Sequence, residues 1–242
     1  MPKVIKLKKG LDISLVGEAL SELNELPLQR EYALVPDNFR GVVPKMLVKE
    51  GEEVKAGTPL FFDKYHPEVL FCSPVSGTLA GVVRGAKRKI LKVVVQAAQE
   101  QRYETFDLPA LEQADKEVVS AALLKAGFWP MVLQRPYGII ADALTTPKAI
   151  FVSGFDLAPD MDYLLAGRQD DLQMGFRVLA KLTDGKVHLG LKSGREGVLD
   201  KIEGVEKHYF SGPHPAGNVG VQIHHIDPIN KGELVWTVGV QE

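Results

Sequence analysis

A glycine-rich and proline-rich stretch, Gly212 to Gly220, contains the residues best placed for ligand chemistry. It follows a predicted strand at 207–210 and precedes an apolar stretch, 219–226, that could open a helix. Glycine-rich strand-to-helix turns expose backbone N–H groups, which bind anions. His214 could add a switchable charge there, and Asn218 a hydrogen-bond donor or acceptor. The alternative is structural, in which the prolines stiffen a connection and the glycines only permit the turn.

The histidine and cysteine pattern predicts no metal site and no catalytic nucleophile. His224 and His225 are adjacent, so on a helix they diverge by about 100° and cannot face one ion together. Cys72 is the single cysteine, which excludes an internal disulfide, a zinc finger and a four-thiolate iron–sulfur cluster. We interpret it as a buried small apolar residue in a β-rich run. We assign no catalytic residue and no metal ligand.

Neither of the common nucleotide fingerprints is present. No two of the 23 glycines are spaced as G-x-G, so the dinucleotide pattern G-x-G-x-x-G is absent, as is G-x-x-x-x-G-K-[ST] for a nucleoside triphosphate. A nucleotide-type sheet in this chain is therefore predicted to lack the usual ligand loop.

Composition excludes several function classes. The chain has 242 residues, 45% apolar and 25% charged, with a net charge of −2. This balance is that of a globular protein with a packed core. No block of positive charge is long enough to track a phosphate backbone, so nucleic acid is not an expected partner. No run approaches the ~20 apolar residues of a membrane-crossing helix. The first ten residues lack a secretory signal, so we expect the chain to stay in the cytoplasm.

The elements predict two domains of different class. Residues 1–101 read as short strands and turns, including predicted strands at 42–48, 58–62, 78–83 and 89–97. Residues 102–242 read as a helix near 118–126 followed by alternating elements: strand 149–152, helix 161–182, strand 186–191, short helix 196–202, strand 207–210 and strand 233–240. Strand, helix and strand in series imply right-handed crossovers and a parallel sheet. The predicted fold class is α+β multidomain: an all-β half, then an α/β Rossmann-like half.

The first half resembles the barrel-sandwich hybrid of biotinyl and lipoyl carrier domains. Its half-repeats are 43–60 and 73–79, with glycines at the corners of a flattened barrel. Carriers of this type attach their cofactor to a lysine in an Asp-Lys hairpin, and Asp63-Lys64 lies between the halves here. The loop that follows is longer and bulkier than the tip an attaching ligase recognises. A surface lysine on a repurposed fold is therefore the preferred interpretation over a lipoyl-type carrier.

The whole chain resembles the A subunit of the bacterial sodium-translocating NADH:quinone reductase. Six segments in order carry the resemblance: 8–12, 44–51, 62–64, 84–88, 134–136 and 212–217. The resemblance implies a peripheral subunit on the cytoplasmic face of the inner membrane, in a complex that passes electrons from NADH to ubiquinone and pumps sodium ions. It implies that the flavins, the iron–sulfur centre and the NADH site belong to other subunits, and that this chain binds no cofactor. Family members are longer, so the chain is expected to be the amino-terminal part, ending before further domains.

Two alternatives stay open, a lipoyl-type carrier and a flavin- or nucleotide-binding electron-transfer subunit. The flavin subunits of complex I and of the related Rnf complex carry a glycine-dense loop where this chain has Gln134 to Gly138, whose bulky residues would obstruct a phosphate. One cysteine also cannot supply the cluster motifs of the Rnf C subunit. If the chain contacts the quinone or a partner, the hydrogen-bond donors Arg135, His214 and Asn218 are the predicted contacts.

Overall fold

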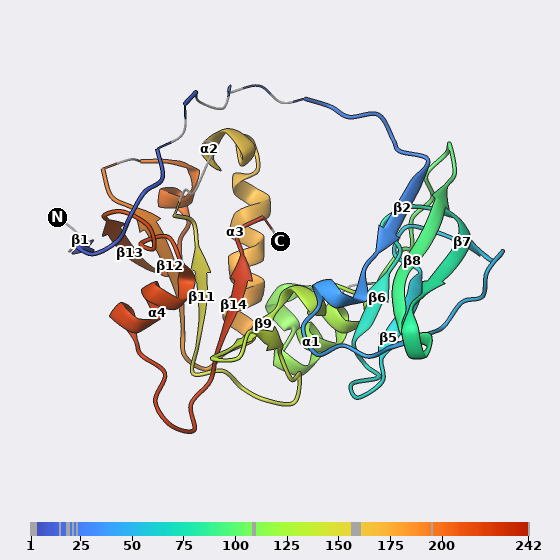
Figure 1. Ribbon diagram of the computed structural model, residues 1–242. Helices are drawn as coiled ribbons and strands as arrows, with labels where there is room; N and C mark the ends of the chain where they lie inside the picture. Colours follow the sequence, from blue (N-terminus) through green and yellow to red (C-terminus); the bar gives the residue numbers. More distant parts are fainter. Residues whose placement is uncertain are drawn as a thin grey trace. The chain divides into compact units, whose positions relative to one another are not determined.

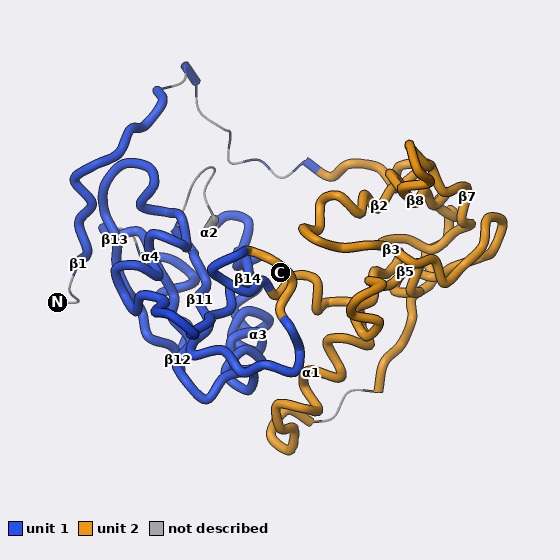
Figure 2. The backbone as a smooth tube through the Cα atoms, turned by 60° about the horizontal axis from the view of Figure 1, so that its bottom comes forward, with its two compact units in different colours: residues 1–24, 133–137, 142–242 blue, residues 25–132, 138–141 orange. Residues whose placement is uncertain are grey.

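The computed structural model describes residues 4–14, 16–17, 20, 22, 24–107, 110–155, 161–194 and 196–241. The chain forms two compact units (Figure 2). Unit 1 comprises residues 1–24, 133–137 and 142–242, and unit 2 comprises residues 25–132 and 138–141.

Unit 2 is built around two small antiparallel sheets (Figure 1). One sheet has the order β2-β8-β7-β4 and the other the order β3-β5-β6. The strands of this unit are β2 (Glu31–Leu34), β3 (Pro44–Met46), β4 (Glu53–Val54), β5 (Pro59–Asp63), β6 (Leu70–Cys72), β7 (Gly77–Arg84), β8 (Ile90–Ala97) and β10 (Ile139–Ile140). Its 3-10 turns are η1 (Pro36–Asn38), η2 (Ala86–Arg88), η3 (Leu111–Gln113) and η4 (Trp129–Met131).

The core of unit 2 follows from alternation along these strands. Leu79, Val93 and Val95 point inward from the four-stranded sheet and are almost fully buried, as expected where one face of a strand is covered. From the three-stranded sheet, the rings of Phe61 and Phe71 stack with centroids 4.6 Å apart. These residues give the barrel-sandwich half a closed apolar interior.

The helix of unit 2, α1 (Lys116–Lys125), begins and ends beside residues that favour helix termini. Asp115 is the N-cap, and its side chain accepts a hydrogen bond from the Val118 N–H. Gly127 follows the helix with φ +75°, in the left-handed region that glycine tolerates best. A Cβ on Gly127 would lie 2.4 Å from Cys72 Sγ, so the glycine also lets the chain pack against β6.

Unit 1 contains a mainly parallel sheet whose strands follow the order β1-β13-β12-β11-β14-β9. Only β9 runs antiparallel to its neighbour β14 in this set. The elements are β1 (Val4–Lys6), β9 (Leu133–Arg135), β11 (Ala149–Ser153), α2 (Met161–Leu164), α3 (Gln169–Lys181), β12 (Lys186–Lys192), η5 (Val198–Lys201), β13 (Glu206–Ser211), α4 (Val219–Ile226) and β14 (Val235–Gly239).

Both faces of the central strand β11 are buried. Ala149 and Phe151 pack with Ile223 of α4 in one apolar cluster, and Ile150 and Val152, which point to the other face, are also buried. A strand covered on both faces reads as a continuous apolar run. The parallel sheet predicted from the sequence is confirmed in β11 to β14.

Two features of unit 1 differ from the predicted elements. The single helix predicted over 161–182 is divided into α2 and α3, and the short helix predicted over 196–202 is the 3-10 turn η5.

The sequence analysis placed residues 1–101 in the barrel domain, whereas β1 pairs in parallel with β13, Val4 opposite Tyr209. An edge strand of three residues has too little periodicity to reveal a partner about 200 residues away.

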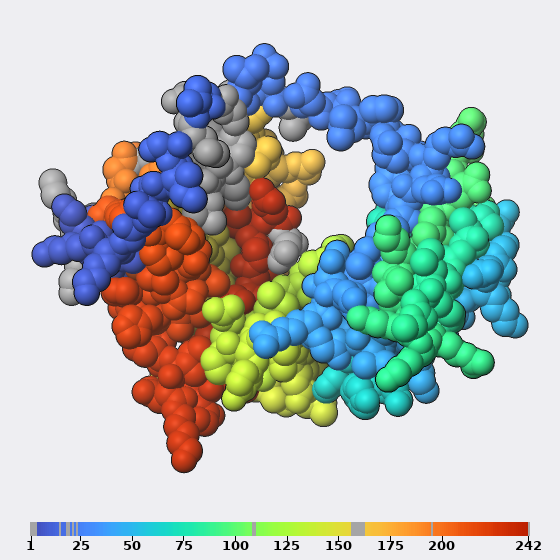
Figure 3. Space-filling view, viewed as in Figure 1, coloured from blue at the N-terminus to red at the C-terminus, as the bar shows by residue number. Residues whose placement is uncertain are grey.

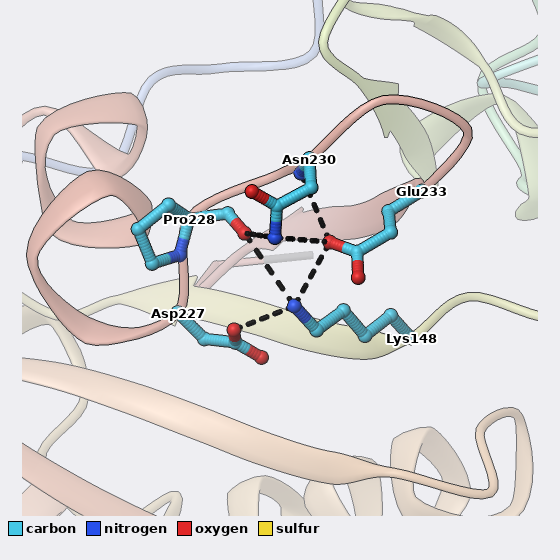
Figure 4. Close-up of polar contacts among 5 residues, drawn as sticks. All are labelled: Lys148, Asp227, Pro228, Asn230 and Glu233. Atoms are coloured by element: carbon cyan, nitrogen blue, oxygen red, sulfur yellow. Dashed lines mark hydrogen bonds and ion pairs between the residues drawn. The ribbon is translucent and has the colours of Figure 1, made fainter.

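A polar cluster fixes the loop between α4 and β14 (Figure 4). Lys148, directly before β11, forms ion pairs with Asp227 Oδ1 at 2.6 Å and Glu233 Oε2 at 2.9 Å. Glu233 also accepts a hydrogen bond from the Asn230 N–H at 2.9 Å. These contacts raise the pKa of Lys148 and lower that of Glu233. The cluster lies where the parallel strands β11 and β14 begin, at the end opposite to the one where such sheets bind ligands.

Candidate functional site

The strand order of unit 1 contains a topological switch point. From β11, the next strands β12 and β13 lie on one side, whereas β14 lies on the other. Open α/β sheets bind ligands at such a point, beyond the carboxyl ends of the strands. Here those ends are Ser153 of β11 and Gly239 of β14, and the glycine-rich stretch 212–217 leads from β13 into α4. The turn singled out in the sequence thus lies at the edge where this fold class places ligands.

The chain itself packs closely around this turn. Ser153 Oγ donates a hydrogen bond to the Gly217 carbonyl at 3.0 Å. Gln222, 1% exposed, directs its Nε2 at the Ala216 carbonyl at 3.4 Å. Ala216 and Gly217 are themselves buried. Strand β12 makes room for the buried amide, because a Cβ on Gly190 would lie 2.2 Å from Gln222 Oε1.

Arg135 and Asn218 both border the first turn of α4. Arg135 lies opposite Val235 in the β9–β14 pair, and its Nη2 would lie 2.7 Å from a Cβ on Gly220. Asn218 is the N-cap residue of α4, but its side chain makes no capping hydrogen bond. The exposed carboxamide of Asn218 and the half-buried guanidinium of Arg135 therefore remain available as hydrogen-bond donors.

His214 lies on the same turn but is held through its backbone. Its N–H donates to Asp12 Oδ1 at 2.7 Å, and its carbonyl accepts from the Leu11 N–H at 3.0 Å. The imidazole is exposed. No hydrogen bond or ion pair joins the side chains of Arg135, His214 and Asn218 among the residues that the structure describes.

Residues 7–12 of the amino-terminal segment hydrogen-bond to residues 211–214 of the turn. We call this contact the clasp, and nothing in the sequence analysis predicted it. Figure 3 shows this segment, in blue, lying against orange-red atoms of the same unit. Beyond β1, the Leu7 N–H donates to the Ser211 carbonyl at 2.8 Å. Two glycines allow the backbones to meet, since a Cβ on Gly10 would lie 2.0 Å from the His214 oxygen and one on Gly212 would lie 2.3 Å from the Leu7 oxygen. The sequence carries one indirect signal, because residues 8–12 and 212–217 both belong to the six segments that resemble the reductase subunit.

We expect Gly10→Ala to open this clasp. Its Cβ would collide with backbone, which cannot rotate away, and its φ of +158° is unfavourable for alanine. Hydrogen exchange of the Leu7 and Leu11 amides should accelerate at least about tenfold, because local opening then needs little free energy. Gly41→Ala is the matched control, since Gly41 also has positive φ but no neighbour within 4 Å. Unchanged exchange in Gly10→Ala would contradict the clasp.

A histidine pair lies on the α4 face of the same sheet. His188 Nδ1 and His208 Nε2, on neighbouring strands, are 3.0 Å apart, and the His188 ring stacks on Phe151 with centroids 4.6 Å apart. Burial, and next the neighbouring His208, lower the pKa of His188 to about 4. Burial also lowers the pKa of His208. At neutral pH the pair is therefore uncharged, with one ring donating to the other.

The lowered pKa predicts a specific loss of stability in mild acid. The folded protein keeps His188 neutral down to about pH 4, whereas an unfolded chain takes up the proton near pH 6.5. The contribution of His188 is therefore complete above pH 6.5 and is lost as the pH falls toward 4. We expect the melting temperature of wild type to fall more steeply across this window than that of His188→Phe. His224→Gln, at an exposed position, should keep the wild-type slope, and equal slopes for wild type and His188→Phe would contradict the prediction.

Cys72 and His225 are the remaining residues that were weighed as a nucleophile and as a metal ligand. Cys72 is half-buried, and burial, with a smaller effect of Glu104, raises its pKa to about 11. It is therefore a thiol at neutral pH and a poor nucleophile. His225 Nδ1 lies 2.9 Å from the Val221 carbonyl of its own helix. No group of three or more His, Cys, Asp or Glu side chains is arranged to hold a metal ion within the described ranges.

The Asp63-Lys64 hairpin lies at the end of β5. Asp63 is 6% exposed, and its Oδ1 accepts hydrogen bonds from the Val43 N–H at 3.0 Å and the Tyr65 N–H at 3.4 Å. The carboxylate therefore shapes the turn, while Lys64 is exposed with its Nζ 5.3 Å from the centre of the Tyr65 ring.

Comparison with known proteins identifies both halves. Residues 5–98 match the family model described as the NqrA N-terminal barrel-sandwich hybrid domain, and residues 114–242 match the NqrA second alpha/beta domain. These matches confirm the predicted fold class.

Relatives named as the A subunit of Na(+)-translocating NADH-quinone reductase match along the chain. Those of Yersinia pseudotuberculosis (strain IP 31758) and Neisseria meningitidis (strain DSM 15465) are each 36% identical over 244 residues, covering 99% of this chain and 55% of the relative. That of Rhodopirellula baltica is 36% identical over 247 residues, covering 99% of this chain and 54% of the relative. The chain thus spans about half the length of the relatives it matches. With both domain models matched in order, the chain belongs to the NqrA family.

Proposed function

We propose that this chain acts as a peripheral subunit of a sodium-translocating NADH:quinone reductase and contributes to quinone reduction without a redox cofactor of its own. Family membership supports this assignment, because the matched relatives are named as the A subunit of that enzyme. The partners are then the other subunits of the complex, and the location is the cytoplasmic face of the inner membrane. Among the described residues, no helix has the length and apolar character needed to cross a bilayer.

The observation that carries the cofactor-free role is the packing at the carboxyl edge of the sheet. In dinucleotide-binding domains, glycines keep this edge open for a pyrophosphate. In this chain, Ser153 donates to the carbonyl of the buried Gly217, and Gln222 donates to that of the buried Ala216. The space beside the first turn of α4 is thus used by protein backbone, which suits a scaffolding and shielding role better than flavin binding.

Arg135, His214 and Asn218 are the proposed contacts to the quinone headgroup. A quinone carbonyl accepts hydrogen bonds and gains negative charge as it takes up electrons. The Arg135 guanidinium is half-buried and borders the amino end of α4, where the helix dipole also favours negative charge. Asn218 and His214 offer further donors from the same turn.

Single replacements in the assembled complex test these contacts. Arg135→Gln, Asn218→Ala and His214→Gln should each lower quinone reduction while leaving NADH oxidation by an artificial acceptor unchanged. Losing one hydrogen bond to a developing charge predicts a fall of about tenfold or more. Lys201→Gln, an exposed change of charge in the same unit, is the control. Unchanged quinone reduction in all three variants would remove these residues from the proposal.

A complex that lacks this chain tests the role of the chain itself. We expect it to oxidise NADH with an artificial acceptor but to fail in ubiquinone reduction. Full ubiquinone reduction without the chain would contradict the proposed function.

A flavin- or nucleotide-binding subunit is the second candidate, because the switch point between β11 and β14 lies where such folds bind their cofactor. Flavin absorbance in the purified chain would support this candidate over the first. A lipoyl adduct on the exposed Lys64, detected by intact mass, would instead establish a carrier.

A further inference from the structure

The hairpin between β7 and β8 in unit 2 (Figure 1) ends in a turn of unusual composition. Lys87 and Arg88 are consecutive residues with φ of +53° and +62°. The Lys89 N–H donates to the Ala86 carbonyl at 3.2 Å, which closes a tight turn around them. Two consecutive left-handed residues are normally supplied by Asn-Gly, because other side chains crowd the backbone there. Strain kept at an exposed turn is a reason to look for function in its side chains.

These side chains form a concentrated positive charge. We use the name basic tip for residues 83–92, which include five cations: Arg84, Lys87, Arg88, Lys89 and Lys92. All five are exposed, and the sequence has no Asp or Glu from 85 to 99.

Little of this charge is neutralised nearby. Lys89 pairs with Asp37 at 2.6 Å. The neighbouring Glu50 accepts a hydrogen bond from the Val82 N–H at 2.9 Å. Arg84 Nη1 donates to the Arg88 carbonyl at 3.2 Å. The other cations, including both strained residues, form no ion pair within the part of the chain that the structure describes.

Exposed aliphatic side chains are interleaved with the cations. Val83 is 47% exposed and lies opposite Lys92 in the β7–β8 ladder. Leu91 is 38% exposed and packs over Gly85, where a Cβ would lie 3.1 Å from its Cδ1. Apolar groups and long cations on one protruding turn are the combination that binds the interface of an anionic bilayer.

We propose that the basic tip attaches unit 2 to an anionic phospholipid surface. Lys and Arg near such a surface are attracted by its negative potential, and Val83 and Leu91 can enter the boundary between headgroups and acyl chains. An exposed hairpin end with cations and aliphatic side chains side by side can meet a broad deformable surface without a matching groove. Because the whole chain carries a net charge of −2, this attraction is local, and the tip would set which face of unit 2 meets the membrane.

Vesicle flotation with the purified chain tests the proposal. We expect the chain to float with vesicles of phosphatidylglycerol and phosphatidylethanolamine but not with phosphatidylcholine vesicles. Binding should be lost at about 0.5 M salt, since screening shortens the reach of the surface potential to roughly 4 Å.

The double variant Lys87→Asn with Arg88→Gly removes two charges and supplies the residues that this turn prefers. It should fold at least as stably as wild type, which separates loss of binding from loss of structure. Its partition onto the anionic vesicles should fall about 30-fold, or roughly fivefold for each cation. Lys45→Gln with Lys49→Gln removes the same charge from exposed positions of the same unit and should bind like wild type.

Equal partition of the tip variant and wild type would overturn the proposal, as would equal binding to neutral vesicles. If the variant binds vesicles normally but no longer assembles with the other subunits, the tip contacts an acidic protein partner instead. The vesicle assay does not involve quinone, so its failure and the failure of the proposed function can be told apart.

Discussion

Gly190→Ala is expected to lower the free energy of unfolding by about 3 kcal/mol, because the added methyl group would overpack the site and displace a buried amide. Gly190 lies within β12, and its missing side chain leaves the space that Gln222 Oε1 occupies. A methyl group at this position would push the Gln222 amide away from the Ala216 carbonyl. Urea denaturation of unit 1, followed by a probe of its sheet, measures the loss.

A double-mutant cycle shows whether the collision causes this loss. Gln222→Ala removes the amide that meets the new methyl group, so the pair Gly190→Ala with Gln222→Ala should be more stable than the two single losses predict. Gly175→Ala is the matched control in a helix, since nothing lies within 4 Å of that position. It should stabilise the protein by roughly 0.5–1 kcal/mol. Purely additive losses in the cycle would contradict the contact.

Trp129→Ala should cost unit 2 about 4 kcal/mol, in the range measured for large aromatic residues cut back to alanine. The Trp129 side chain is completely buried, so alanine would leave a cavity that rigid neighbours cannot fill. Its Nε1 donates to the Ala141 carbonyl at 2.7 Å, and alanine would leave that carbonyl without this donor.

Trp129→Phe separates the two contributions. Phenylalanine keeps most of the apolar volume but lacks the N–H donor, so it should cost less than half as much as alanine, through the lost hydrogen bond and a smaller cavity. Phe128→Ala serves as the control, since Phe128 is 57% exposed. Equal losses for Trp129→Ala and Phe128→Ala in chemical denaturation would show that Trp129 is not the anchor of this region.

The elements that follow local rules were the predictable part of this fold. The run at 149–152 is apolar at each position because β11 is buried on both faces, and such runs are recognisable without knowledge of their neighbours. Helix α1 carries a capping aspartate and a terminal glycine in the places that helix ends favour. In unit 2, glycines at the corners predicted the turns between short strands.

The candidate site was predictable only in part. Glycine and proline marked the turn from 212 to 220, and the structure places it at the edge where parallel sheets bind ligands. The position of Arg135 beside α4 depends on the pairing of β9 with β14, which joins residues 100 positions apart. The clasp by Leu11 and Asp12 likewise depends on distant backbone contacts. Sequence patterns report local preference, so they give no signal for partners chosen at such separations.

The backbone conformation of the basic tip could not be predicted from the sequence, for a different reason. The gap between the strands predicted at 78–83 and 89–97 indicates a turn that contains Gly85, but the glycine is not the residue that takes the left-handed backbone. Lys87 and Arg88 take it instead, against their own preference. A departure of this kind is invisible in the sequence, because the same letters fit a longer and relaxed loop.

The pairing of β1 with β13 has a consequence for biosynthesis. Val4 meets Tyr209, so the ribosome must add about 200 further residues before the first strand finds its place. At roughly 5–20 residues per second this takes on the order of 10–40 s. During that interval unit 2 can already fold, while β1 has no strand to pair with and stays open to chaperones and peptidases. Closure of this edge of the sheet by β1 is therefore a late step in the folding of unit 1.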